Sequence, residues 1–116
     1  MQHDPAHLVD ILQAAQRIQL FTQGMDKTAF EASLKDQSAV LWQIALLGEA
    51  TRRLSQEFRA TYPEIPWQAM AGMRSKVIHA YDRIDLVEVW KVVQNDIPEL
   101  IAQIAPLVPP DDSEQK

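Results

Sequence analysis

The chain has 116 residues, with 11 basic and 16 acidic side chains and a formal net charge of −5 at pH 7. This length is that of one domain with a single core. The negative charge argues against a protein that coats nucleic acid by bulk electrostatics, although it leaves room for a local basic site. Cysteine is absent, which excludes disulfides, thiolate metal sites and a cysteine nucleophile.

The sequence shows no pattern typical of membrane insertion. The start, MQHDPAHLVD, has no basic stretch followed by an apolar run. No segment approaches the ~18 consecutive apolar residues that a membrane-spanning helix needs. We therefore expect a cytoplasmic protein that does not contact a membrane.

The first half of the chain has helical periodicity. Apolar residues at steps of three and four predict a helix over residues 4–24. Asp26 is placed to cap a short helix through Phe30, and Asp36 or Ser38 to open a long one. This long helix is predicted to carry the apolar residues Val40, Leu41, Ile44, Leu47, Leu54 and Phe58.

The long helix is expected to be central. Residues 39–47 are apolar nearly all round except for Gln43, which predicts burial against more than one neighbour, as in a bundle that also dimerises. Gly48 is expected to permit close approach of another helix. The three tryptophans, Trp42, Trp67 and Trp90, are interpreted as core or interface residues.

In the second half, prolines separate the predicted elements. A helix that starts at about Trp67 is predicted to carry the segment 74–81, and residues 82–85 are predicted to turn into a last helix that Pro98 kinks. No β-hairpin signal is evident. The residues after Ala105, PLVPPDDSEQK, are predicted to form a mobile tail, which divides the chain into a helical domain over 1–105 and a tail over 106–116.

Arg74 and His79 are the residues best suited to chemistry. A guanidinium holds a phosphate through two parallel hydrogen bonds, and an imidazole titrates near neutral pH. In metal-independent RNA cleavage the ribose 2′-OH attacks the adjacent phosphate, which requires a base, an acid for the leaving 5′-oxygen and positive charge near the phosphorane. His79 fits the base or the acid, and Arg74 fits the charge.

Helical spacing limits what one copy of the chain achieves with this pair. On a regular helix Arg74 and His79 lie ~140° apart, whereas Arg74 and Tyr81 lie within ~20° of each other. One protomer is therefore a poor site unless the helix distorts near His79. A two-fold dimer brings two copies of each residue to one cleft, so the pattern favours a homodimer.

The spacing Arg74-x4-His79-x-Tyr81 matches the Arg-x4-His-x-Tyr signature of HepT, a branch of the HEPN superfamily. Further matches are Leu47-Gly48-Glu49-Ala50 followed by Leu54-Ser55, Ile65-Pro66-Trp67, Met73-Arg74 and Val89-Trp90. Over about residues 8 to 104, the chain thus resembles a HepT toxin.

This resemblance implies an all-α, HEPN-like fold, an up-and-down bundle of about four to five helices that forms a two-fold dimer. It also implies a metal-independent endoribonuclease toxin of a type II, or AMPylation-controlled type VII, toxin–antitoxin pair, with Arg74 and His79 catalytic in a composite cleft. Its partners would be RNA and a nucleotidyltransferase antitoxin, with which it would form a dimer or a higher hetero-oligomer. The antitoxin would transfer AMP to Tyr81, and the added anionic nucleotide would block and repel RNA.

Three neighbours of the motif are candidates for RNA contact. Ser75 stands where HEPN motifs commonly have Asn or Asp, and its shorter side chain is expected to hydrogen-bond less well. Lys76 and Arg83 are either RNA ligands or ordinary surface charges. They belong to the segment 51–83, which has six basic and three acidic residues and so a charge of +3 against −8 for the rest of the chain.

Other readings of the same residues stay open. Arg74 also fits an ion pair with Glu49 or Asp85. His3 and His7 have a metal-ligand spacing, but an exposed terminus is the better interpretation, and we expect neither a metal site nor a cofactor. The alternative function is a non-catalytic subunit of a nucleotidyltransferase complex that binds only nucleotide or partner.

Overall fold

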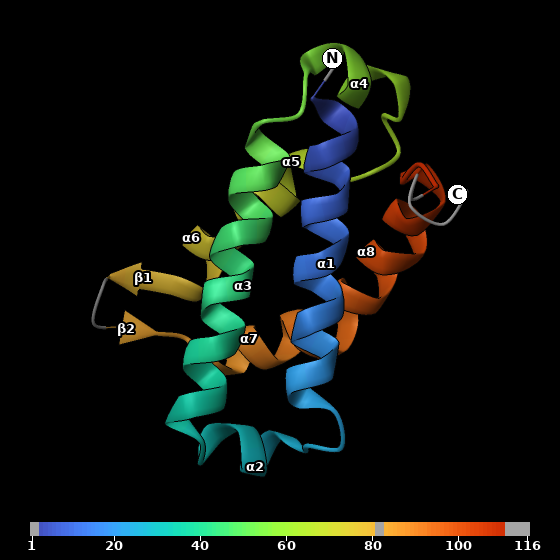
Figure 1. Cartoon of the computed structure of the whole chain (residues 1–116). Helices are drawn as coiled ribbons and strands as arrows, with labels where there is room; N and C mark the ends of the chain where they lie inside the picture. Colours follow the sequence, from blue (N-terminus) through green and yellow to red (C-terminus); the bar gives the residue numbers. More distant parts are fainter. Residues whose placement is uncertain (1–2, 81–82, 111–116) are drawn as a thin grey trace.

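The computed structural model describes residues 3–80 and 83–110, with the backbone alone at residues 79 and 80. The chain passes up and down along a helical bundle (Figure 1). Helices α1 (Asp4–Thr22) and α3 (Leu34–Arg52) lie side by side, joined by α2 (Lys27–Glu31), and α8 (Ile97–Ile104) packs on α1. Between them the chain forms α4 (Gln56–Thr61), α5 (Trp67–Ala71), α6 (Met73–Val77), the strands β1 (Ile78–Ala80) and β2 (Arg83–Ile84), and α7 (Leu86–Lys91).

The beginning of the chain folds as its pattern predicts. Helix α1 starts at Asp4, with a proline in its first turn, and ends at Thr22. Gly24 follows with φ of 77°, in the left-handed region that glycine adopts without a steric penalty. Asp26 caps α2 by accepting a hydrogen bond of 2.8 Å from the backbone N–H of Ala29.

Helix α3 begins earlier than predicted. Neither Asp36 nor Ser38 is its N-cap; Ser33 holds that position, and its hydroxyl accepts a hydrogen bond from the backbone N–H of Asp36. The same hydroxyl donates to the Asp36 carboxylate at 2.7 Å. Asp36 was therefore expected at the correct helix end but acts as the third helical residue, where its carboxylate also complements the helix dipole.

The predicted continuation of α3 through Phe58 is wrong. The helix ends at Arg52, and Ser55 caps the separate helix α4 by accepting a hydrogen bond from the N–H of Phe58. The buried carboxylate of Asp4 fixes this corner, because it accepts 2.9 Å and 2.7 Å hydrogen bonds from the Ser55 N–H and hydroxyl. This contact joins the start of α1 to the end of α3.

The last part of the bundle is one irregular helical run. Asp85, at the end of the predicted turn, caps α7 by accepting a hydrogen bond from the N–H of Glu88. A π-helical turn over Val92–Asp96 leads into α8, with Pro98 in the first turn of that helix. The irregularity predicted at Pro98 is therefore present, because proline has no N–H for the i−4 carbonyl and its ring crowds the preceding turn.

The end of the chain packs further than the predicted tail boundary at residue 105. Residues Ala105–Leu107 form a 3-10 turn, and Leu107 and Val108 contact the core as half-buried side chains. Residues 111–116 of the predicted tail lie outside the described residues.

One apolar core joins these helices. Its fully buried large side chains come from α1, α2, α3, α6 and the final helical run: Leu8, Ile11, Ile18, Phe30, Val40, Ile44, Leu47, Val77, Val89, Val92, Ile97 and Ile104. Burial of such side chains is the main stabilising contribution to a domain of this size. None of the helices within the described ranges is both long enough and apolar enough to cross a membrane.

Candidate functional site

The segment that leads to Arg74 is held tightly against α3. A Cβ atom added at Gly48 would lie 3.2 Å from the carbonyl oxygen of Ala71, closer than ordinary van der Waals contact, so the close helix approach predicted for Gly48 is confirmed. The buried indole of Trp67 donates from Nε1 to the carbonyl oxygens of Arg59 and Tyr62, at 3.2 and 3.0 Å. The first turn of α5 is thereby tied to α4 and its C-terminal cap.

Helix α6 presents its polar residues to solvent. Met73 and Val77, at its two ends, are buried, whereas Arg74, Ser75 and Lys76 are exposed. Two buried anchors four residues apart orient the whole turn. The guanidinium of Arg74 therefore emerges from a firmly seated backbone.

The prediction that this helix continues through the motif is wrong. Helix α6 ends at Val77, and β1 pairs in antiparallel register with β2, with Ile78 opposite Ile84 and Ala80 opposite Arg83. The all-α expectation therefore holds for the bulk of the chain but not here. Two β-branched residues, Val77 and Ile78, stand at the transition, and the last helical carbonyl, that of Val77, accepts a 2.8 Å hydrogen bond from the N–H of Asp85.

Because α6 ends at Val77, the angles predicted around one helix between Arg74, His79 and Tyr81 no longer apply. The expected separations of Arg74 from His79 and from Tyr81 assumed one regular helix, whereas His79 lies on β1 (Figure 1). The distortion near His79 that a single-copy site would need is present. The side chain of His79, and Tyr81 as a whole, lie outside the described residues, so their catalytic and modification roles stay predictions.

The three candidate RNA ligands occupy different positions. Ser75 follows Arg74 on the exposed side of α6. The ammonium of Lys76 lies 3.5 Å from the Asp96 carboxylate and 3.8 Å from that of Glu88, which draws it toward α7 and the π-helical turn. Arg83 is exposed on β2, beside the strand that carries His79. The hairpin thus brings Arg83 toward the motif, and the ion pairs draw Lys76 away.

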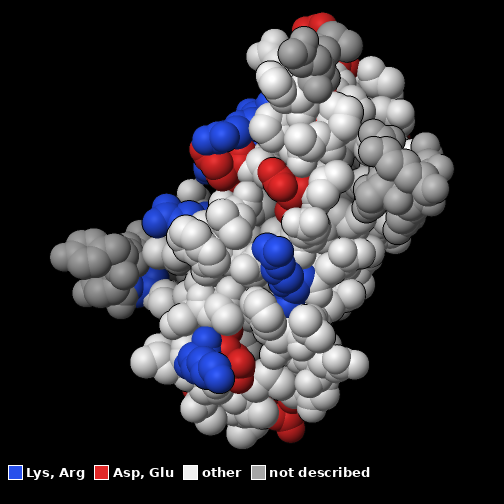
Figure 2. All heavy atoms as spheres, in the orientation of Figure 1, with Lys and Arg blue, Asp and Glu red and all other residues white. Residues whose placement is uncertain are grey.

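Most of the basic charge in residues 51–83 is already engaged. Arg52 and Arg53 each lie 3.8 Å from the carboxylate of Glu49, and Arg59 donates to the carbonyl oxygens of Arg52 and Leu54. Within 3–80 and 83–110, Arg74 and Arg83 form no such ion pair, and the alternative pairing of Arg74 with Glu49 is not present. Figure 2 shows Lys and Arg side chains along the flank from which the hairpin projects.

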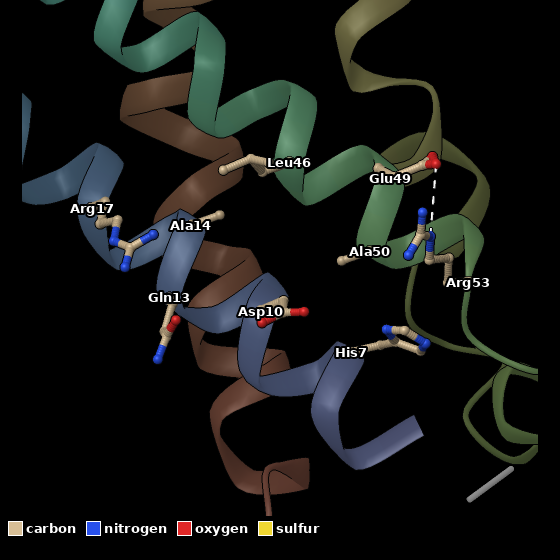
Figure 3. Close-up of a pocket in the computed structure, with 9 residues that line it drawn as sticks. All are labelled: His7, Asp10, Gln13, Ala14, Arg17, Leu46, Glu49, Ala50 and Arg53. Carbon is tan, nitrogen blue, oxygen red and sulfur yellow. Dashed lines mark ion pairs between the residues drawn. The ribbon is translucent and has the colours of Figure 1, made fainter. Parts of the chain in front are cut away.

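A pocket that the sequence did not suggest lies between α1 and α3 (Figure 3). Its volume is about 350 Å³, and its charged lining is Asp10 and Arg17 from α1 and Glu49 and Arg53 from α3. Two carboxylates balance two guanidinium groups, so the lining has no net preference for an anionic ligand. His7 lines this pocket as well, and no group of three metal-ligating side chains occurs in the part of the chain that the structure describes.

The three tryptophans differ in environment. Trp67 is buried, and the ring centroid of Trp90 lies 5.3 Å from that of Phe30 in the core. Trp42 is 63% exposed on α3, so it fits only the interface half of the sequence interpretation. A large aromatic side chain left in water is typical of a surface that a partner covers.

Comparison with known proteins assigns the chain to a family. Residues 11–107 match the family described as ribonuclease HepT-like. A protein of Thermococcus cleftensis named "Probable ribonuclease HepT" is 40% identical over 94 residues, which span 81% of this chain and 86% of that protein. Two candidate RNases of Methanocaldococcus jannaschii are 34% identical over 99 residues and 36% identical over 103 residues, and cover 91% and 85% of those proteins. No solved structure matches the chain.

The match runs from within α1 to the 3-10 turn after α8, and it includes the hairpin, Arg74 and Arg83. The aligned residues also span most of the length of these relatives. The chain belongs to the HepT-like ribonuclease family.

Proposed function

We propose that this protein is an endoribonuclease toxin that cleaves RNA without a metal ion. Its site is a cleft to which two copies of the chain contribute Arg74 and His79. The observation that carries the proposal is the exposed Arg74, seated on the core by Met73 and Val77 and free of ion pairs within the described residues, directly before the hairpin of His79 and Arg83. The names of the relatives, which refer to RNases, support the same substrate.

The chemistry follows from these residue types. One histidine removes the proton of the ribose 2′-OH, which attacks the adjacent phosphorus, and another protonates the departing 5′-oxygen. Arg74 binds the phosphate through two parallel hydrogen bonds and stabilises the charge of the phosphorane. The P–O5′ bond breaks as the new P–O2′ bond forms, which leaves a 2′,3′-cyclic phosphate and a 5′-hydroxyl. Arg83, with Ser75, is suited to contact the flanking RNA.

Regulation completes the proposal. A cognate nucleotidyltransferase acts as the antitoxin by transferring AMP to Tyr81, two residues after His79, within a dimer or a larger hetero-oligomer. The added nucleotide brings bulk and negative charge beside the cleft, which excludes an anionic substrate. Co-expression with such an enzyme should raise the intact mass by one or more AMP units, and Tyr81→Phe should remove the increase. An unchanged mass, or AMP on a peptide without Tyr81, would contradict this assignment.

The test of the activity uses matched substitutions. In the presence of chelator, the purified protein should cleave RNA, and Arg74→Ala and His79→Ala should each lower the rate at least about 100-fold, since each removes a group that acts in the transition state. Arg17→Ala and His7→Ala remove the same residue types from the α1–α3 pocket and should leave the rate unchanged. Equal activity of the motif and pocket variants, with unchanged helical circular dichroism, would refute the proposal.

A further inference from the structure

The outward face of α3 has the pattern of a helix interface. Its exposed residues recur at three- and four-residue steps, which places them within ~40° of Trp42 around the helix axis. These residues are Lys35, Ser38, Trp42, Leu46 and Glu49, and we call them the α3 face. Trp42 is 63% exposed and Leu46 is 37% exposed, so an apolar centre is flanked by one positive and one negative charge.

We propose that a second copy of this chain covers the α3 face, with the two α3 helices antiparallel about a two-fold axis at Trp42. This proposal deepens the dimer of the proposed function and rests on it. In such a pair, two residues lie opposite each other when their numbers add up to 84, twice the number of Trp42. Lys35 then faces Glu49 of the second copy, and Ser38 faces Leu46.

Both pairings are complementary. The Lys35 ammonium and the Glu49 carboxylate attract each other, and two-fold symmetry forms this contact twice. The small side chain of Ser38 leaves room for the larger Leu46, as the packing of two helices requires. Glu49 already has Arg52 and Arg53 within 3.8 Å, but all three side chains are at least half exposed, and exposed pairs of this kind are weak enough to rearrange.

The position of the motif beside α3 determines where the two hairpins lie in such a dimer. The segment that carries the motif contacts α3 at Gly48, where the backbone of Ala71 lies against the helix. It then continues to α7, which packs on α2, the helix that precedes α3. The hairpin therefore projects beside the middle of α3 (Figure 1). Helix α1 lies on the other flank of α3, and the pocket of Figure 3 borders the α3 face, because Leu46 and Glu49 belong to both.

A two-fold axis that lies in the interface and perpendicular to α3 reverses the helix direction but keeps each flank on its own side. Both hairpins then lie on the same side of the dimer, close to the axis. A parallel pairing, whose axis follows α3, would instead place them on opposite sides. The pairing that the side chains of the α3 face favour is thus the one that assembles two copies of Arg74 and His79 into one cleft.

The chain has no cysteine, so single introduced thiols report this register directly. Ser38→Cys and Leu46→Cys copies are mixed and treated with a thiol cross-linker whose spacer is shorter than the ~12 Å that eight helical residues span. Antiparallel pairing predicts cross-linked dimers in the mixture and far fewer with either variant alone. Cross-linking of each variant alone to the level of the mixture would overturn the proposal, and so would its absence in all three samples.

A second measurement tests the face without thiols. The wild-type protein should sediment as a dimer, and Trp42→Glu should sediment as a monomer with unchanged helical circular dichroism. Leu20→Glu is the matched control, because Leu20 is 64% exposed near the end of α1 and is not part of the α3 face. A dimeric Trp42→Glu protein, or a wild-type monomer that uses this face only for a different protein, would overturn the proposal.

These outcomes separate the interface from the activity. A protein that cross-links between positions 38 and 46 but leaves RNA intact retains the interface and refutes the proposed function. A protein that cleaves RNA in an Arg74-dependent manner but fails to cross-link retains the function and refutes the interface.

Discussion

Among single residues, Asp4 shows how a polar contact fixes the frame around the site. Its carboxylate is buried, and burial alone would raise its pKa. The two hydrogen bonds from Ser55 oppose this effect, and the pKa of Asp4 lies below its ordinary value. Because Ser55 also caps α4, one carboxylate joins the start of α1 to the corner after α3.

The lowered pKa predicts how stability depends on pH. Asp4 stabilises the fold above the ordinary aspartate pKa of about 3.9, and this contribution is lost as the pH falls through the lower folded-state pKa. We expect Asp4→Asn to reduce the free energy of unfolding at pH 7 by about 1 to 2 kcal/mol. The loss should shrink at pH 3. Urea unfolding at both pH values measures it.

Asp10→Asn is the control for this prediction, because it removes the same charge from an exposed position on α1. It should change the unfolding free energy little at either pH. A loss for Asp4→Asn that is the same at pH 7 and pH 3 would contradict the role given to its ionised form.

Individual caps were predictable where one side chain decides them. Asp26 and Asp85 stand directly before helical patterns, and each accepts the backbone hydrogen bond that its position predicts. Asp4 was not predictable as the partner of Ser55, because 51 residues separate them in the chain and no local pattern carries that contact. Arg74 was recognisable as a candidate site residue only from the motif to which it belongs.

At the level of elements, the largest difference between sequence and structure lies in the motif itself. Val77 and Ile78 continue the apolar stripe of a helix, yet they are also typical strand residues, and a strand of three residues is too short for periodicity to reveal. The deciding interaction is the hydrogen bond from Asp85 to the Val77 carbonyl, which forms only after the chain has turned back. Tertiary structure therefore selects the hairpin.

The start of α3 offers a direct test of a second such difference. Ser33→Ala removes the N-cap and should lower the free energy of unfolding by about 1 kcal/mol. Ser38→Ala removes a hydroxyl from the exposed interior of the same helix and should cost far less, since alanine has the higher helix propensity. Thermal unfolding at one protein concentration compares them, and a larger loss for Ser38→Ala would place the helix start where the sequence alone suggested.

For the whole molecule, charge and symmetry work together. The chain is acidic, so the proposed function requires RNA to bind at Arg74 and Arg83, which form no ion pair within the described residues, rather than over the entire surface. The sequence predicted a dimer because one regular helix separates Arg74 from His79. The structure removes that reason, and the exposed α3 face, with Trp42 at its centre, replaces it.

Charge reversal tests the proposed symmetry. Lys35→Glu places a like charge opposite Glu49 of the second copy at two symmetric positions, so the dimer dissociation constant should rise at least about five-fold at low salt. The double variant Lys35→Glu/Glu49→Lys restores opposite charges and should recover most of the affinity. Sedimentation over a range of protein and salt concentrations measures both. Additive losses in the double variant would mean that the two residues do not meet.

The chemistry of the RNA ends tests the central claim most directly. Attack by the ribose 2′-OH, assisted by His79 and Arg74, predicts fragments that end in a 2′,3′-cyclic phosphate and begin with a 5′-hydroxyl, formed in the presence of chelator. Mass spectrometry of the digested RNA identifies both ends without knowledge of the cleavage position. Fragments with 3′-hydroxyl and 5′-phosphate ends, produced only after a divalent metal is added, would contradict the account.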